Sequence, residues 1–199
     1  MAARGTDAMF VLKRTKTLVG ALLALALLAA AVPLAGAQVG VVIRTPILVT
    51  SAGQSPDVLM VRVLLNRIGV DSITDELAEP AQLEGVQTVI VALGGSQKGL
   101  GAAGIDVEEE LARIERVLSA AEAKGLTIIG VHIGGEGRRG PLSERFIVAA
   151  APRTHYLIVT EEGNRDGYFD RLAQERGIGL TVVPNTLDVG PVIQSMLER

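Results

Sequence analysis

The chain has 199 residues, with 19 basic and 22 acidic side chains and no cysteine. This slight acidic excess argues against a nucleic acid or an anionic membrane surface as the main partner. Disulfides are excluded, and because tryptophan is absent and aromatic residues make up 3% of the chain, a stacking platform for bases or sugars is not expected. The fold must therefore be stabilised by packing.

Residues 1–37 have the pattern of a secretory signal peptide. An apolar run over 18–31 follows a basic stretch that contains Arg4, Lys13, Arg14 and Lys16. Ala35-Gly36-Ala37 then supplies the small residues that a signal peptidase requires, so we expect cleavage after Ala37. The protein would be exported to the periplasm, the cell surface or the medium. Without residues 1–37 the chain keeps 15 basic and 21 acidic side chains, a net charge near −6.

An uncleaved membrane anchor is the alternative interpretation of this segment. No charged residue occurs between Leu18 and Ile43, and about 20 apolar residues suffice to span a bilayer. Pro33 and Gly36 interrupt the stretch, which favours cleavage. No cysteine is available for a lipid anchor. We therefore expect a signal peptide over 1–37 and a single α/β domain over 38–199, whose oligomeric state the sequence leaves open.

Apolar runs rich in β-branched residues alternate with amphipathic stretches along 38–199. Strands are predicted at 47–51, 70–74, 88–93, 126–133, 156–160 and 180–183. Helices are predicted at 56–68, 107–124, 142–150, 167–176 and 188–197, with a short turn of helix at 80–83 and a glycine-rich loop at 94–105. The alternation predicts a three-layer Rossmann-like or flavodoxin-like sandwich around a mostly parallel five- to six-stranded sheet. Strand orders 2-1-3-4-5 and 3-2-1-4-5-6 both remain open.

Four connections follow the carboxyl ends of the predicted strands, where open parallel sheets bind their ligands. All four are rich in glycine and in side chains that form hydrogen bonds: 51–55, 94–104, 132–140 and 161–166. The connections at the opposite edge resemble ordinary helix ends. The sequence therefore places a binding site at the carboxyl edge of the sheet.

The first of these loops has the composition of an anion cradle. Ser51, Gln54 and Ser55 precede a helix whose N-terminal amides favour negative charge. The alternative is that Ser55 only caps this helix, with Pro56 at its first position.

The second loop contains the spacing G-x-G-x-x-G over 99–104. A dinucleotide fingerprint begins directly after its strand, whereas here residues 94–98 intervene. The helix that starts at Asp106 also carries Glu108, Glu109 and Glu110 in its first turn, where they would repel a pyrophosphate, so no nicotinamide cofactor is expected. Asp106 and Glu109 form a capping-box pattern. We expect instead that four residues offer amides, a hydroxyl and an ammonium to a small acidic ligand: Gly94, Gly95, Ser96 and Lys98.

The third loop carries His132, Glu136, Arg138 and Arg139. Paired arginines bind carboxylates and phosphates in bidentate fashion, and His132 is expected at the edge of the site or buried beside it as a core residue. The arginines could equally be solvated loop charges. Next to two cations, His132 and Glu136 make a poor metal site, and no metal or cofactor is expected.

Three segments together resemble an uncharacterised family of exported bacterial proteins, the domain of unknown function numbered 6305. They are 47–56, 94–105 and 132–140, of which Lys-Gly-Leu-Gly-Ala-Ala-Gly at 98–104 and His-Ile-Gly-Gly-Glu at 132–136 are the most specific. The resemblance implies a bacterial exported protein. It implies no established activity, so no catalytic residue is transferred.

Our leading hypothesis is a non-catalytic extracytoplasmic protein that binds a small anionic molecule. His132 and Glu136 are expected to shape the pocket. Direct contacts with the ligand are assigned to five residues: Ser55, Ser96, Lys98, Arg138 and Arg139. The rival hypothesis is a hydrolase or transferase that uses His132 with Ser96 or Glu136 as acid and base. A structural or partner-binding module, in which the glycine-rich loops are only tight turns, is the third.

Overall fold

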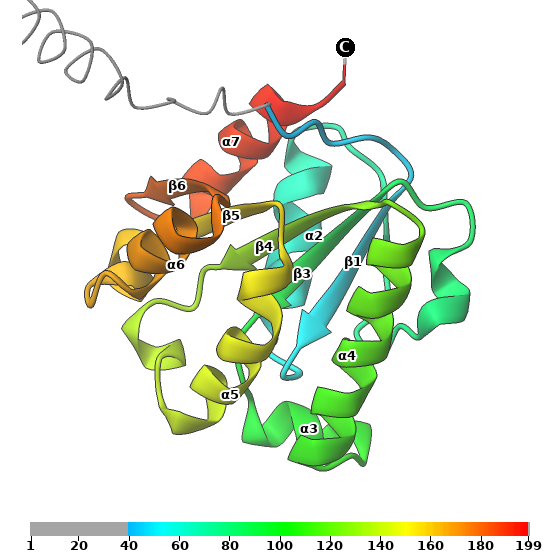
Figure 1. The fold of residues 1–199 in the computed structure, drawn as a ribbon, viewed down its shortest axis with the longest axis vertical. Coiled ribbons are helices and arrows are strands. Elements are labelled where there is room, and N and C mark those ends of the chain that lie inside the picture. Colours follow the sequence, from blue (N-terminus) through cyan, green and yellow to red (C-terminus); the bar gives the residue numbers. More distant parts are fainter. Residues whose placement is uncertain (1–39, 199) are drawn as a thin grey trace, which may run out of the picture. The chain divides into compact units, whose positions relative to one another are not determined.

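The computed structural model describes residues 40–198, so the predicted signal peptide lies outside the described residues. The described chain contains six strands, namely β1 (Ile47–Ala52), β2 (Ser72–Thr74), β3 (Thr88–Leu93), β4 (Thr127–His132), β5 (Tyr156–Thr160) and β6 (Gly179–Val183). Its α-helices are α2 (Asp57–Arg67), α3 (Gln97–Ala103), α4 (Val107–Ala123), α5 (Pro141–Ala150), α6 (Tyr168–Arg176) and α7 (Val189–Met196). Strands and helices alternate along the chain as the hydrophobic pattern predicts (Figure 1).

The six strands form one sheet in the order β2-β1-β3-β4-β5-β6. Every neighbouring pair is parallel. This order extends the 2-1-3-4-5 alternative, and the flavodoxin-like α/β sandwich is confirmed. The strand order reverses at β1, so the switch point where such sheets bind ligands lies between the carboxyl ends of β1 and β3.

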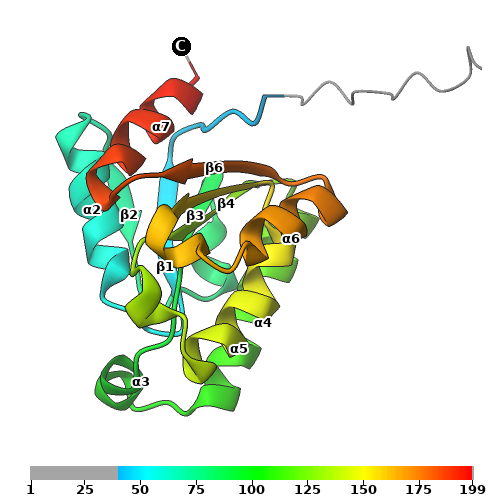
Figure 2. The ribbon, with the colours of Figure 1, turned by 90° about the vertical axis from the view of Figure 1, so that its left-hand side faces the viewer.

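Helices lie on both faces of the sheet (Figure 2), and a cluster of buried hydrophobic side chains packs on each face. In β3, Val89 and Val91 pack toward α4, α5 and α6, while Ile90 and Ala92 pack toward α2 and α7. This alternation is the two-residue period of a strand. Because helices cover both faces, all six residues of β3 are buried.

The predicted glycine-rich loop contains a helix, which corrects the sequence-based assignment of residues 94–105. Glycine lowers helix propensity by about 1 kcal/mol relative to alanine, so the composition favoured a loop. Ser96 caps α3 by accepting a hydrogen bond from the Gly99 N–H at 3.1 Å. Gly104 ends the helix with φ +70°, a left-handed conformation that favours glycine. The residues with the G-x-G-x-x-G spacing therefore belong to a helix that is capped at both ends.

The other predicted boundaries agree with the structure to within two residues. Helix α2 begins at Asp57, and Ser55 Oγ accepts a hydrogen bond from the Asp57 N–H at 3.2 Å. The predicted short turn of helix is the 3-10 segment Pro80–Leu83. Among residues 40–198, no helix combines the length and the apolar character needed to cross a membrane.

Candidate functional site

The connections that follow β1, β3, β4 and β5 lie against one another at the carboxyl edge of the sheet. A side chain on Gly53 would meet the backbone of Gly94 and Gly95. A Cβ on Gly134 would approach Asp57, which follows β1, and a Cβ on Gly163 would approach His132. In Figure 1 the arrowhead of β1 points toward α3 and the start of α5, which flank this edge. The predicted site residues thus belong to one cluster of loops.

Ser51, Gln54 and Ser55 are buried, and each forms hydrogen bonds with other groups of the protein. Ser51 Oγ accepts a hydrogen bond from the Ser55 N–H at 3.2 Å. Gln54 has a left-handed backbone with φ +56°, and its Nε2 donates to Glu110 Oε1 at 3.1 Å and to the Glu76 carbonyl at 3.0 Å. Ser51 and Gln54 therefore shape the first loop. Ser55 accepts from the backbone of α2, which leaves the hydrogen of its hydroxyl without an acceptor among the described residues.

A buried ion pair on α4 supports this first loop. Arg113 Nε lies 2.7 Å from Glu110 Oε2, and their side chains are 5% and 0% exposed. Glu110 Oε1 accepts the Gly53 N–H at 2.9 Å, and Arg113 donates to the carbonyls of Ser51 and Ala78. Of the three first-turn glutamates expected to repel a pyrophosphate, Glu110 is therefore buried and paired with Arg113, whereas Glu108 and Glu109 are exposed.

Three backbone N–H groups at the start of the second loop form hydrogen bonds within the protein. The Gly94 N–H donates to the Ala52 carbonyl at 3.1 Å, and the Gly95 N–H donates to Ser143 Oγ at 3.0 Å. The Ser96 N–H donates to the Gly53 carbonyl at 2.8 Å. Ser96 Oγ accepts the Gly99 N–H in the cap of α3, which leaves its hydroxyl hydrogen without an acceptor among the described residues, as at Ser55. These three amides therefore tie the loop to its neighbours and are not free to bind a ligand in this structure. Lys98 lies on α3 with its side chain exposed.

Arg139 and Glu136 of the third loop are engaged by other side chains. The guanidinium of Arg139 lies 2.6 Å from Glu144 and 2.9 Å from Asp166, bonds to the Gly163 carbonyl and stacks over the Phe169 ring. Its side chain is 11% exposed. Glu136 is exposed and pairs with Arg165. The predicted roles of Arg139 as a ligand contact and of Glu136 as a pocket wall are not supported, because both side chains stabilise the loops.

Arg138 differs from its neighbour because it has no acidic partner. The residue is half-buried, and its NH1 donates to the Gly95 carbonyl at 3.2 Å. Among residues 40–198 no carboxylate oxygen lies within 4.0 Å of its guanidinium. The third loop therefore holds one cation that is fixed in place and not neutralised.

Asp57 is a further candidate residue, which the sequence interpretation did not single out. It lies in the first turn of α2, where an acidic residue is expected for reasons of the helix dipole alone. Its Oδ2 is buried and has no hydrogen-bond partner among the described residues. A Cβ on Gly134 would lie 2.8 Å from this oxygen and would overlap the Arg138 stem. Asp57 and Arg138 thus flank the same glycine without pairing.

His132 ends β4 and is completely buried. Its Nδ1 donates to the Leu93 carbonyl at 2.8 Å, because a carbonyl can only accept. Nε2 is then an acceptor, and both it and Thr160 Oγ1 lack partners among the described residues. Burial lowers the pKa of His132, partly offset by the bond to Leu93. No hydrogen bond joins His132 to Ser96 or Glu136, so the acid and base of the rival hydrolase hypothesis are not assembled.

Acidification is expected to destabilise the protein through His132. Its pKa is lowered in the folded state, whereas an unfolded histidine titrates near about 6.5. The contribution of neutral His132 to the free energy of unfolding is fully present above about pH 6.5. It is lost as the pH falls from there toward the lowered pKa of the folded state, because the unfolded state binds more protons in this range. Melting temperatures measured from pH 7.5 to 5 should fall more steeply for the wild type than for His132→Asn, whose amide can replace Nδ1 as donor. Equal slopes would contradict this assignment.

A separate depression of about 330 Å³ lies beside α2 and β2. Its lining contains none of the predicted site residues and consists of Leu59, Arg62, Thr74, Asp75, Glu76 and Leu77. Across residues 40–198, no three histidine, aspartate or glutamate side chains are grouped so that they could hold a metal ion.

The fold and its loops define a flavodoxin-like α/β protein with a candidate site at the switch point, an architecture that supports many unrelated functions. Residues 44–197 match the family model described as "Domain of unknown function (DUF6305)", and the chain belongs to this family. A search of curated proteins gave no match.

Two solved structures are similar to this chain at a low level. One is the psychrotrophic esterase EstA from Pseudoalteromonas sp., inhibited by monoethylphosphonate, with 11% identity, a TM-score of 0.31, and coverage of 75% of this chain and 93% of that chain. The other is a serine-to-alanine mutant of the esterase AlinE4, with 15% identity, a TM-score of 0.30, and coverage of 80% and 85%. These TM-scores are too low for the likeness to bear on activity.

Proposed function

We propose that this protein is an extracytoplasmic binding protein for a small ligand with an anionic group. The ligand binds at the carboxyl edge of the sheet, near the switch point between β1 and β3. Arg138 is the primary contact. The hydroxyl of Ser55 and the ammonium of Lys98 supplement it.

The uncompensated guanidinium of Arg138 carries this proposal. Arg139 and Arg165, which lie on the same group of loops, each bond to a carboxylate at 2.9 Å or less. Arg138 bonds only to a backbone carbonyl among the described residues, which fixes its position while its charge remains available. A planar guanidinium that is held in place suits carboxylate or phosphate recognition, because little rotamer entropy is lost on binding.

Binding is favoured over catalysis by the state of the candidate catalytic groups. Ser96 Oγ caps α3, Glu136 pairs with Arg165, and the imidazole of His132 is enclosed. A nucleophile needs a base within hydrogen-bond reach, and these three side chains do not provide that arrangement.

Replacement of Arg138 by alanine should abolish anion binding and leave the fold intact. We expect acetate, succinate, inorganic phosphate or adenosine monophosphate, screened singly, to raise the melting temperature of the full chain. A ligand at 100 times its Kd stabilises by about 2.7 kcal/mol, which corresponds to a shift of several degrees.

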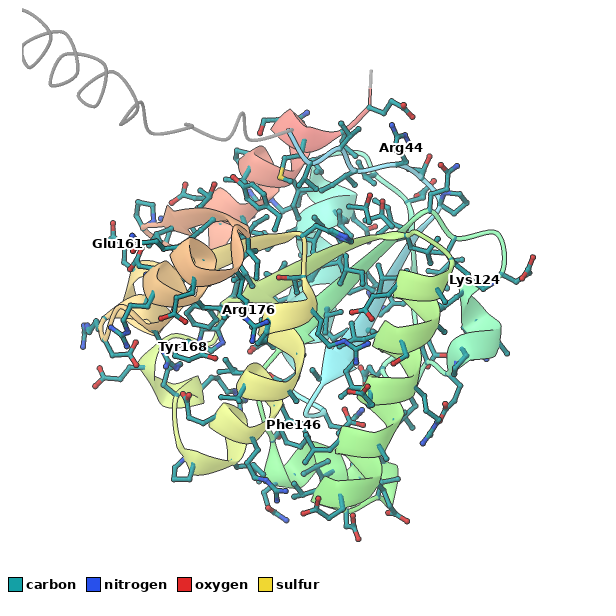
Figure 3. The ribbon with its side chains drawn as sticks, viewed as in Figure 1. Arg44, Lys124, Phe146, Glu161, Tyr168 and Arg176 are labelled. Atoms are coloured by element: carbon teal, nitrogen blue, oxygen red, sulfur yellow. The ribbon has the colours of Figure 1, made fainter. Side chains whose placement is uncertain are left out.

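The matched control is Arg176→Ala, which removes the same charge from the exposed end of α6 (labelled in Figure 3). This variant should keep the full ligand-induced shift. The proposal fails if no anion stabilises the wild type, or if Arg138→Ala and Arg176→Ala respond alike.

A further inference from the structure

Asp57 carries a polar oxygen whose environment within the protein is incomplete. Burial of a carboxylate oxygen without a donor is unfavourable, and buried polar atoms in folded proteins are normally satisfied. The helix dipole of α2 accounts for an acid in the first turn, but it supplies no hydrogen bond to Oδ2. A ligand donor at this carboxylate would remove the deficit.

Other unsatisfied atoms lie at the same edge of the sheet. Five buried side-chain atoms lack partners among the described residues, and four of them end or follow strands at this edge: Asp57 Oδ2, Thr74 Oγ1, His132 Nε2 and Thr160 Oγ1. A Cβ on Gly163 would lie 2.8 Å from His132 Nε2 and 3.3 Å from Thr160 Oγ1, so these two atoms face the same small space. The deficit of hydrogen-bond donors therefore extends beyond one side chain.

Asp57 Oδ2 and the stem of Arg138 both lie within 2.8 Å of the position of a Cβ on Gly134, yet the two side chains do not form an ion pair. Two oppositely charged side chains that lie close together without pairing can each bind a ligand group of the opposite charge. A ligand with an anion alone would satisfy Arg138 while placing a negative charge near Asp57. Specificity often arises from such a repulsive element.

We infer that the ligand is zwitterionic, with its anionic group on Arg138 and a protonated amine on the Asp57 carboxylate. This inference rests on the proposed function and specifies the chemical class of its ligand. Ser55 Oγ and Asp57 Oδ2 are each 3.7 Å from the position of a Cβ on Gly94, so the Ser55 hydroxyl lies beside the amine position. The absence of a side chain at Gly94 keeps the position next to the carboxylate free of a Cβ.

The test compares anions that differ only in an amino group. We would titrate β-alanine against propionate, taurine against ethanesulfonate, and 2-aminoethyl phosphate against ethyl phosphate into the full chain by calorimetry. At least one amine-bearing member should bind about tenfold more tightly than its partner, the effect of one charge-assisted hydrogen bond. Asp57→Asn should bring that ratio close to one, and Arg138→Ala should weaken both members.

Asp71→Asn is the matched control, because Asp71 is exposed and lies before β2 at the opposite edge of the sheet. It should retain the preference for the amine. Without ligand, Asp57→Asn should melt at or above the wild-type temperature, since it removes an unpaired carboxylate; this confirms that the variant is folded. Binding of both members with equal affinity would overturn the zwitterion inference and leave the proposed function intact, whereas binding of neither member would overturn both.

Discussion

Replacement of Arg113 by methionine is expected to lower the free energy of unfolding by about 3–5 kcal/mol. The substitution leaves Glu110 as an unpaired buried charge beneath the first loop. It also removes the donors to the carbonyls of Ser51 and Ala78. Because Glu110 holds the Gly53 N–H and the Gln54 side chain, the damage should extend to the loop that precedes Asp57. Urea denaturation monitored by circular dichroism measures this loss.

Arg116→Met provides the matched control on the same helix. Arg116 lies one turn further along α4 and pairs with Glu79 at 2.7 Å, but its side chain is 53% exposed. Surface ion pairs contribute about 0–1 kcal/mol, so this variant should unfold close to the wild type. If Arg113→Met cost no more than Arg116→Met, the buried pair would not support the loop as described.

Two glycines of α3 should respond to alanine with opposite signs. A Cβ on Gly99 would overlap the Gln54 carbonyl oxygen, whereas nothing lies within 4 Å of a Cβ on Gly101. The Gln54 backbone cannot easily move away, because its side chain is bound to Glu110. Overpacking of this kind costs about 1–3 kcal/mol or more, which exceeds the gain of about 1 kcal/mol in helix propensity.

Gly101→Ala has the propensity gain without the clash and should therefore be stabilising by up to about 1 kcal/mol. Thermal melts of the two variants beside the wild type measure the contrast. A stability change of the same sign in both would show that the approach of α3 to the first loop is not as close as in this structure.

The features of the fold that depend on local patterns could be predicted from the sequence. The apolar period of the strands and the capping box of Asp106 and Glu109 are both present, with the two cap bonds at 2.8 Å. The strand order could not be chosen, because it depends on β2 pairing with β1, a three-residue contact that carries little sequence signal. Helix α3 was missed because its stability comes from the Ser96 cap and from packing.

The loops that meet at the carboxyl edge of the sheet could be predicted from the sequence, but the pairing of their side chains could not. Arg138 and Arg139 are adjacent in the sequence, yet Arg139 is neutralised by carboxylates from α5 and the fourth loop while Arg138 is not. Such pairing depends on tertiary contacts that a linear pattern does not contain. For the same reason Asp57 looked like an ordinary helix-start residue, and its unsatisfied oxygen became visible only in the folded structure.

Mapping of the ligand contacts by nuclear magnetic resonance tests the central claim most directly. The amide resonances of the isotope-labelled protein would be recorded during separate titrations with β-alanine, taurine and 2-aminoethyl phosphate. We predict that the shifts concentrate at Gly94, Gly134 and Arg138 and in the first turn of α2, and that they disappear in Arg138→Ala. Shifts confined to the depression that contains Leu59 and Arg62, or no shifts at all, would contradict a ligand site at the switch point.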